Sequence, residues 1–298
     1  MGELIIKIGV ISDIHSNYHA LTNVLNFLEG KIDNLICGGD FVGYGPQPQE
    51  SINAFLDYPF PIYLCLGNHD LGVRYKYSCR KQNPLKLDHK ILKTFNFRET
   101  ASEMLERNAK EIKKEHFDFL LNLPFKQIFQ IDQTKFYLTH GTPSVRRTEN
   151  VGKYLLPPPL QHPEVTTSRL KNDKKAEEAE IIVVGHTHRR FLIKRDKFSS
   201  WSLIDDILNN KPTKFPLKFT FHKDRIIFNP GSVGQPRDGT GNASFCILDL
   251  DGKTIEFNDL EYQMEDFYKL TKRKGVPEVQ NSSFWANKLG HFSKRNRS

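Results

Sequence analysis

Among the side chains that could bind a metal ion, seven stand out because almost all of them follow directly after a short apolar run. The set comprises two carboxylates, one carboxamide and four imidazoles: Asp13, His15, Asp40, Asn68, His140, His186 and His188. Oxygen and nitrogen donors in this mixture suit Mn²⁺, Fe²⁺, Zn²⁺ or Ni²⁺ and differ from the thiolates of a structural zinc site. We therefore predict a metal centre, with Mn²⁺ as the first choice and the other three ions as alternatives.

Seven donors are more than a single ion would use. With one carboxylate shared, they suffice for two divalent ions roughly 3.5 to 4 Å apart. At that spacing a bridging hydroxide can attack phosphorus in line while both ions neutralise the phosphate oxygens. The expected chemistry is hydrolysis of a phosphate ester by a dinuclear centre, with no phosphoenzyme intermediate.

Glycines stand beside several of these donors, as Gly39 does before Asp40 and Gly67 before Asn68, and they allow sharp backbone bends. Each motif alone has an ordinary explanation, because an Asp-Ile-His segment is usually a helix cap and a Gly-His-Thr-His segment is more often a loop. Five such motifs, in order and each after a predicted strand, favour one shared site.

The first part of the chain alternates strand and helix patterns. Apolar runs at residues 4–11, 35–37 and 61–66 predict strands, and amphipathic spacing predicts helices over 20–28 and 48–57. This βαβαβ order implies a largely parallel sheet with right-handed crossovers. In such sheets ligands bind beyond the carboxyl ends of the strands, which is where the predicted donors lie.

Beyond residue 123 the pattern becomes mostly strands, at 126–131, 135–139, 181–184, 226–228, 244–250 and 254–260. Asp251 and Gly252 form a hairpin turn between the last two, and a second sheet accounts for the series. We predict one catalytic domain over residues 1–262, with insertions at about 75–120, 143–175 and 190–222 that cap strand ends. Residues 263–298 form a basic C-terminal extension.

Composition excludes several classes of protein. Hydrophobic residues make up 38% and charged residues 26% of the 298, which indicates a packed globule rather than a disordered chain. The net charge of +8 favours anionic substrates, although nucleic-acid binding is not favoured on charge alone. Cys37, Cys65 and Cys246 lie in apolar runs, so we expect them to be reduced thiols in the core. Because no apolar run approaches the roughly 20 residues of a membrane span, we expect no membrane association and a cytoplasmic location.

The five motifs together resemble those of the calcineurin-like metallophosphoesterases. They run from Asp13-Ile14-His15 through Gly39-Asp40, Gly67-Asn68-His69-Asp70 and His140-Gly141 to Gly185-His186-Thr187-His188, within residues 4–260. Gly43-Tyr44-Gly45-Pro46 and the segment from Asn229 to Arg237 resemble the small prokaryotic phosphodiesterase branch of that family.

The resemblance implies an α/β fold, a four-layer α/β/β/α sandwich of two mixed β-sheets flanked by helices. It also implies that Asp40 bridges the ions and that His69 protonates or stabilises the departing ester oxygen. Asp13, His15 and His188 would bind one ion, and Asn68, His140 and His186 the other. One position departs from many protein phosphatases of the family, since Gly43 stands where they carry a carboxylate that pairs with the catalytic histidine. That departure disfavours a protein phosphatase and leaves the role of His69 as a general acid open.

Two further residues are candidates for substrate binding. Asn17 could orient a phosphate oxygen or serve as a helix N-cap, and Arg237 could clamp phosphate or be a solvated loop cation. We expect a small phosphodiester or nucleotide as substrate. The alternatives are a phosphomonoesterase or protein phosphatase, a nuclease, and regulatory nucleic-acid binding. A non-catalytic scaffold is disfavoured because all seven positions keep competent ligands.

Overall fold

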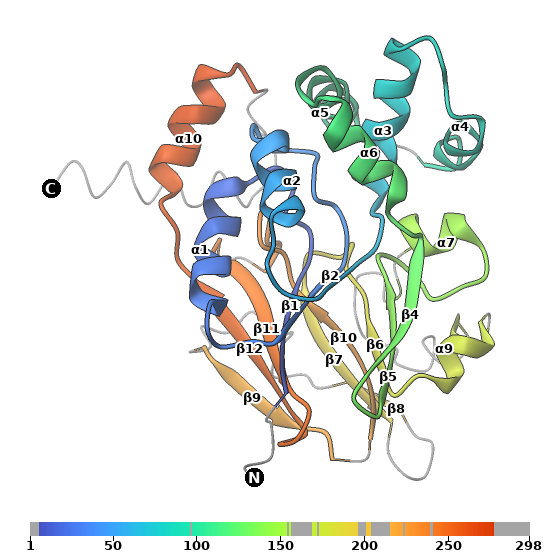
Figure 1. Cartoon of the computed structure of the whole chain (residues 1–298), viewed down its shortest axis with the longest axis vertical. Helices are drawn as coiled ribbons and strands as arrows, with labels where there is room; N and C mark the ends of the chain where they lie inside the picture. The colour runs from blue at the N-terminus through green and yellow to red at the C-terminus, as the bar shows by residue number, and fades with distance from the viewer. Residues whose placement is uncertain are drawn as a thin grey trace, which may run out of the picture.

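Two six-stranded mixed sheets pack face to face in the computed structural model, within the part of the chain that it describes (Figure 1). That part comprises residues 6–95, 97–153, 155, 169–171, 173–195, 201–203, 215–222, 224–238 and 241–276. The first sheet has the order β3 (Ile62–Leu64), β2 (Asn34–Cys37), β1 (Lys7–Ile11), β11 (Ala243–Asp249), β12 (Thr254–Leu260) and β9 (Leu217–Thr220). The second has the order β4 (Lys126–Ile131), β5 (Thr134–Thr139), β6 (Ile181–Val183), β10 (Arg225–Pro230), β7 (Arg190–Arg195) and β8 (Trp201–Leu203).

Alternating side chains on the strands produce three hydrophobic layers. Ile8 and Val10 of β1 face the layer between the sheets, whereas Ile11 faces the helices. On β5, Phe136 likewise faces the layer between the sheets and Tyr137 faces outward. The four-layer α/β/β/α sandwich is therefore confirmed, since the period of two in each buried strand supplies apolar side chains to both of its faces.

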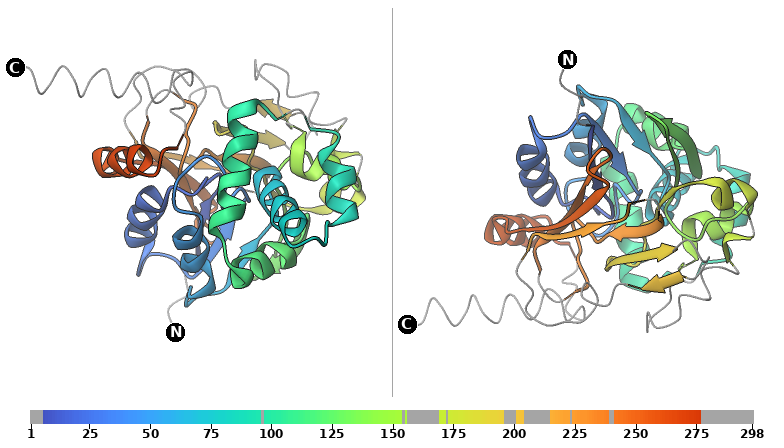
Figure 2. Two further views of the ribbon diagram at one scale, coloured as in Figure 1. Left: turned by 90° about the horizontal axis from the view of Figure 1, so that it is seen from above. Right: turned by 90° about the horizontal axis from the view of Figure 1, so that it is seen from below.

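The helices cover the outer faces and rise above one end of the strands (Figures 1 and 2). The crossovers α1 (Tyr18–Leu28) and α2 (Pro48–Leu56) join the parallel strands β1, β2 and β3. Ala20, Leu21, Val24 and Leu28 form the buried stripe of α1. The remaining helices are α3 (Asn68–Arg80), α4 (Lys86–Leu92), α5 (Glu99–Glu111), α6 (Lys114–Asn122), α7 (Arg147–Gly152), α9 (Lys174–Glu178) and α10 (Met264–Arg273).

The described parts of residues 190–222 differ from the insertion that the sequence predicts. Arg190–Arg195 pairs antiparallel with β10, and Leu217–Thr220 pairs with β12, so both segments belong to the sheets. The apolar centre of β7 is flanked by arginine and lysine, which hides its strand character in the sequence. The extension predicted from residue 263 begins with helix α10, whose Met264 and Phe267 are buried in the core. The basic stretch after residue 276 lies outside the described residues.

An ion pair buried between helices joins α3 to α4. Arg74 donates to Asp88 through Nε (2.7 Å to Oδ2) and Nη2 (2.7 Å to Oδ1), and both side chains are almost fully buried. Removing one partner leaves an uncompensated buried charge. We therefore expect Asp88→Ala to lower the free energy of unfolding by about 3 kcal/mol in urea titrations. Glu106→Ala removes the half-exposed pairs with Lys76 and Arg80 and should change it by less than about 1 kcal/mol. Equal losses in the two variants would contradict this ranking.

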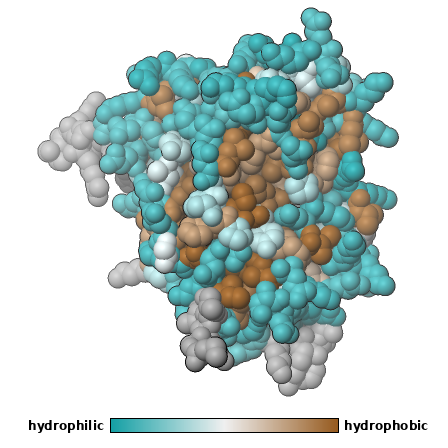
Figure 3. All heavy atoms as spheres, viewed as in Figure 1, coloured by the Kyte–Doolittle hydropathy of each residue, from teal (hydrophilic) through white to brown (hydrophobic). Residues whose placement is uncertain are grey.

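Hydrophobic side chains gather in the middle of the face seen in Figure 3. Exposed examples in the structure include Phe60, just before the edge strand β3, and Ile128 on the edge strand β4. Among the described residues, no helix is both long and apolar enough to cross a membrane.

Candidate metal centre

The predicted donors converge at one end of the sheets. Asp13 follows β1, Asp40 follows β2 and Asn68 opens α3, the helix after β3, while His140 follows β5 and His186 follows β6. Strands β1, β2 and β3 are mutually parallel, as are β5 and β6, so their carboxyl ends bring these residues together. The topology thus gathers side chains from more than 170 residues of sequence into one site.

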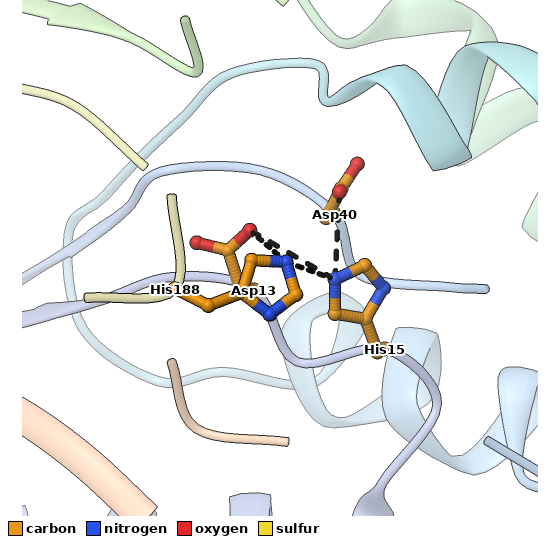
Figure 4. A group of neighbouring side chains, drawn as sticks. All are labelled: Asp13, His15, Asp40 and His188. Carbon is orange, nitrogen blue, oxygen red and sulfur yellow. Dashed lines mark hydrogen bonds and ion pairs between the residues drawn. The ribbon is translucent and has the colours of Figure 1, made fainter. Parts of the chain in front are cut away.

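Four of the donors form a first group, drawn in Figure 4. Donor atoms of Asp13, His15, Asp40 and His188 all lie within 4.8 Å of one another, and all four side chains are buried. His188 Nε2 lies 3.3 Å from Asp13 Oδ1 and 3.0 Å from His15 Nε2. His15 Nε2 in turn lies 3.5 Å from Asp40 Oδ2.

A second group shares Asp40 with the first. Donor atoms of Asp40, His140 and His186 lie within 4.8 Å of one another. His140 Nε2 is 3.2 Å from Asp40 Oδ2 and 3.1 Å from Asn68 Oδ1. The structure therefore brings all seven predicted donors together, with the Asp40 carboxylate between the two groups.

The hydrogen bonds of the imidazoles test whether metal ions fit here. The Nδ1 atoms of His140 and His188 lie 2.6 and 2.7 Å from the carbonyl oxygens of Gly38 and Gln235. Each of these rings thus donates through Nδ1, and in its neutral form points the Nε2 lone pair at a carboxylate. Asp40 Oδ2 is buried and lacks a hydrogen-bond donor of acceptable geometry. Lone pairs that face one another in this way fit divalent cations between them.

The pKa values of the donor side chains reflect how closely the carboxylates and imidazoles are packed. Burial raises the pKa of Asp13 to about 7, and the neighbouring Asp40 adds to the rise. Burial alone would lower the pKa of His140, but the carboxylates of Asp40 and Asp13 raise it to about 9. Burial holds the pKa of His15 and that of His188 well below the ordinary value, so these two rings stay neutral, as metal ligands must be. Without a metal ion, His140 therefore carries the positive charge beside Asp40, and an ion bound there would displace its proton.

The backbone of five donor residues adopts a rarely occupied conformation. Asp13, His15, Asp40, His186 and His188 all have φ between 49° and 69°, in the left-handed region. Non-glycine residues there are strained and cluster at functional sites. The surrounding hydrogen bonds must therefore hold these turns in place.

Asp70 is one residue that holds such a turn, and its role is not predicted from the sequence. Its fully buried carboxylate accepts hydrogen bonds from the backbone N–H groups of Asp40 (2.8 Å), Gly67 (2.9 Å) and Val42 (3.1 Å). Its position two residues after Asn68 is the only sequence signal, and it does not separate this role from an ordinary turn. Asp70 therefore fixes the loop that presents Asp40.

Replacing Asp70 by asparagine should weaken both the fold and metal binding. One side of the amide would place an N–H group against a backbone N–H, and we expect the free energy of unfolding to fall by about 2 kcal/mol. Loss of support for a ligand typically costs about 10-fold to 100-fold in metal affinity, which calorimetry with Mn²⁺ would measure. Asp88→Asn is the matched control, since it destabilises the fold away from the centre and should leave the affinity unchanged. Wild-type affinity in Asp70→Asn would show that the turn holds without the carboxylate.

His69 lies beside the donors and not among them. Its ring packs against those of His15 (4.8 Å between centroids), Tyr44 (4.5 Å) and Phe97 (5.5 Å). Its Nδ1 is buried without a hydrogen-bond partner, and a Cβ atom at Gly43 would lie 2.7 Å from it. Burial lowers the pKa of His69 to about 4, so the ring is neutral near pH 7 and can donate one N–H hydrogen bond.

Asn17 acts as a structural residue, which corrects its prediction as a substrate ligand. Its Oδ1 caps helix α1 by accepting from the N–H of Ala20 (3.1 Å). Its Nδ2 donates to the Gly234 carbonyl and to the Tyr262 hydroxyl, and the side chain is fully buried. The side chain thus anchors the neighbouring 232–237 loop and has no donor left for substrate.

Arg237 lies close enough to the donors for its charge to shift the pKa of His188. Its backbone N–H donates to the His188 carbonyl (3.1 Å), and its side chain is partly exposed. After burial, the Arg237 charge is the main cause that lowers the pKa of His188. Its Nη2 donates to Gln235 Oε1 (3.1 Å), a contact within the same loop.

Comparisons with known proteins agree with this arrangement. Residues 6–253 match the family model described as the calcineurin-like phosphoesterase superfamily domain. An uncharacterized protein of Methanocaldococcus jannaschii is 31% identical over 273 residues, which are 91% of this chain and 94% of that protein. A crystal structure of a metallophosphoesterase from Sphaerobacter thermophilus has a TM-score of 0.69 at 26% identity, covering 95% of this chain and 99% of the other. A hypothetical protein from Pyrococcus horikoshii shares the fold at 19% identity, with a TM-score of 0.67 and coverage of 92% and 95%.

Proposed function

Because this chain belongs to the calcineurin-like phosphoesterase superfamily, whose members are metal-dependent hydrolases of phosphoester bonds, we propose that it is a phosphodiesterase for small or nucleotide phosphodiesters. The observation that carries the proposal is the position of Asp40, whose Oδ2 lies between His15 Nε2 and His140 Nε2 in a buried site. One carboxylate placed between two groups of donors suits two metal ions better than one.

The donors divide between two ions in this proposal. Asp13, His15 and His188 would hold one ion, and Asn68, His140 and His186 would hold the other. Asp40 belongs to both groups and would be available to both ions. When bound, two divalent ions lower the pKa of a water molecule and neutralise the phosphate oxygens, with Mn²⁺ as the first choice.

The remaining residues of the site bind and orient the substrate. The Arg237 guanidinium pairs with a non-bridging phosphate oxygen, and the neutral His69 donates a hydrogen bond to the departing ester oxygen. Tyr44 and Phe97 place partly exposed aromatic rings beside His69. An apolar or aromatic leaving group, such as a nucleoside or a nitrophenol, suits those rings.

The four cysteines are free in the structure, which supports our proposal of a reducing, cytoplasmic location.

The proposal is tested with protein stripped of metal by a chelator and then titrated with Mn²⁺. We expect metal-dependent hydrolysis of bis-p-nitrophenyl phosphate at a higher kcat/KM than that of p-nitrophenyl phosphate. A preference for the monoester, or for single- or double-stranded DNA, would replace the phosphodiesterase with a phosphatase or a nuclease. Failure to bind any divalent ion would refute the centre itself.

A further inference from the structure

Asn108 is a buried polar residue on the apolar face of helix α5. Ala101, Met104, Leu105 and Ala109 form that face together with Asn108, and the Asn108 side chain is fully buried. Its Oδ1 accepts hydrogen bonds from the Ser16 hydroxyl and from the backbone N–H of Gly43, both at 2.8 Å. Its Nδ2 donates to the Gly45 carbonyl at 3.2 Å. One side chain thus spans two loops that are more than 20 residues apart in sequence.

These two loops carry three of the seven donors, Asp13, His15 and Asp40. Ser16 follows His15, and both residues have a left-handed backbone, with φ of 54° and 49°. The Gly45 N–H donates to the His15 carbonyl at 2.7 Å, so the loop held by Asn108 in turn holds His15. A displaced Asn108 would release strained residues on which the ligand geometry depends.

Gly43 connects the same loop to both histidines at the centre of the site. A Cβ atom at this glycine would lie 2.7 Å from His69 Nδ1 and 2.8 Å from His15 Nδ1. The Gly43 backbone, which adopts a φ of 134°, is therefore packed against the two rings. Any shift of this backbone changes the space that both rings occupy.

We propose that Asn108 is a positioning residue that sets the orientation of His15 and His69 through the Gly43–Gly45 loop. The helices that follow β3 then form a structural part of the active site, because α5 supplies the side chain that fixes it. The role rests on the proposed function as far as catalysis is concerned, whereas its effect on the metal site does not depend on the substrate. No contact between Asn108 and the substrate is required.

The test uses the full chain with three measurements: Mn²⁺ affinity by calorimetry, the ¹⁵N chemical shifts of the histidine rings, and kcat and KM. Asn108→Leu keeps a similar volume and removes all three hydrogen bonds. We expect Mn²⁺ affinity and kcat to fall by about 10-fold to 100-fold each, with KM within about threefold, as when support for a ligand is lost. The ring shifts of His15 and His69 should move. Asn108→Asp keeps both accepted hydrogen bonds but turns a carboxylate oxygen toward the Gly45 carbonyl, so we expect a loss in the same direction of about 10-fold.

The control is Leu105→Ala on the same apolar face of α5, where Leu105 packs against Gly72. It should lower the unfolding temperature at least as much as Asn108→Leu while leaving Mn²⁺ affinity and the ring shifts as in the wild type. Wild-type affinity and shifts in both Asn108 variants would overturn the proposal, as would equal losses in Leu105→Ala. If Asn108→Leu does not fold, Asn108→Asp decides by the same measurements. Should the wild type hydrolyse no phosphoester, the proposed function fails, yet metal affinity and ring shifts still test the role of Asn108.

Discussion

An Asp40→Asn variant should lose about 1,000-fold or more of the metal-dependent activity. The Oδ2 atom of Asp40 lies 3.2 Å from His140 Nε2 and 3.5 Å from His15 Nε2, so it faces both groups of donors. A neutral amide removes the negative charge that both ions would share, and several kcal/mol of transition-state stabilisation correspond to about this factor. The measurement is kcat/KM for bis-p-nitrophenyl phosphate at saturating Mn²⁺, together with the number of ions bound.

The control for this variant is Asp118→Asn, which changes an exposed carboxylate paired with Lys114 on helix α6. It should keep wild-type activity and both ions. We expect Asp40→Asn to bind at most one ion tightly while its fold is retained, because Oδ1 can still accept from the backbone N–H of His69. An Asp40→Asn protein that binds two ions with wild-type affinity would show that Asp40 is not the bridge.

The sequence predicts the strands that carry the site better than the strands that complete the sheets. The β1 segment is almost continuously apolar because both of its faces are buried, and its parallel crossovers follow from the alternation with helices. Strand β9 is the edge strand of its sheet and β7 lies next to the edge strand β8, and both carry charged residues. Strand β7 also pairs with β10, and β9 pairs with β12, each about 30 residues or more later in the chain, so no local pattern separates them from a loop.

The metal donors can be predicted because their chemical types are unusual at strand ends. The residues that support them use ordinary chemistry, and only the tertiary structure identifies them. The sequence contains one indication that Asn108 is buried. This carboxamide stands at helical spacing from Ala101, Met104 and Leu105, on the apolar stripe of α5. The two loops that it binds lie more than 60 residues earlier in the chain, and nothing in the helix indicates them.

Replacing His69 by glutamine should reduce activity in a way that depends on the leaving group. In our proposal His69 donates to the departing oxygen, and removing one such donor costs about 100-fold in kcat. A nitrophenolate needs little help to depart, because its charge is already stabilised. We therefore expect a loss below about 10-fold for bis-p-nitrophenyl phosphate and about 100-fold for a diester with an alkyl leaving group.

The matched control is His89→Gln, which alters an exposed histidine that stacks on Tyr75 and belongs to neither donor group. It should leave both kcat values unchanged. A His69→Gln variant with equal losses for both diesters would assign His69 to phosphate binding or to packing against His15, because neither role distinguishes leaving groups. The unpaired Nδ1 beside Gly43 makes leaving-group dependence the decisive measurement, since no protein carboxylate at that position raises the proton affinity of the ring.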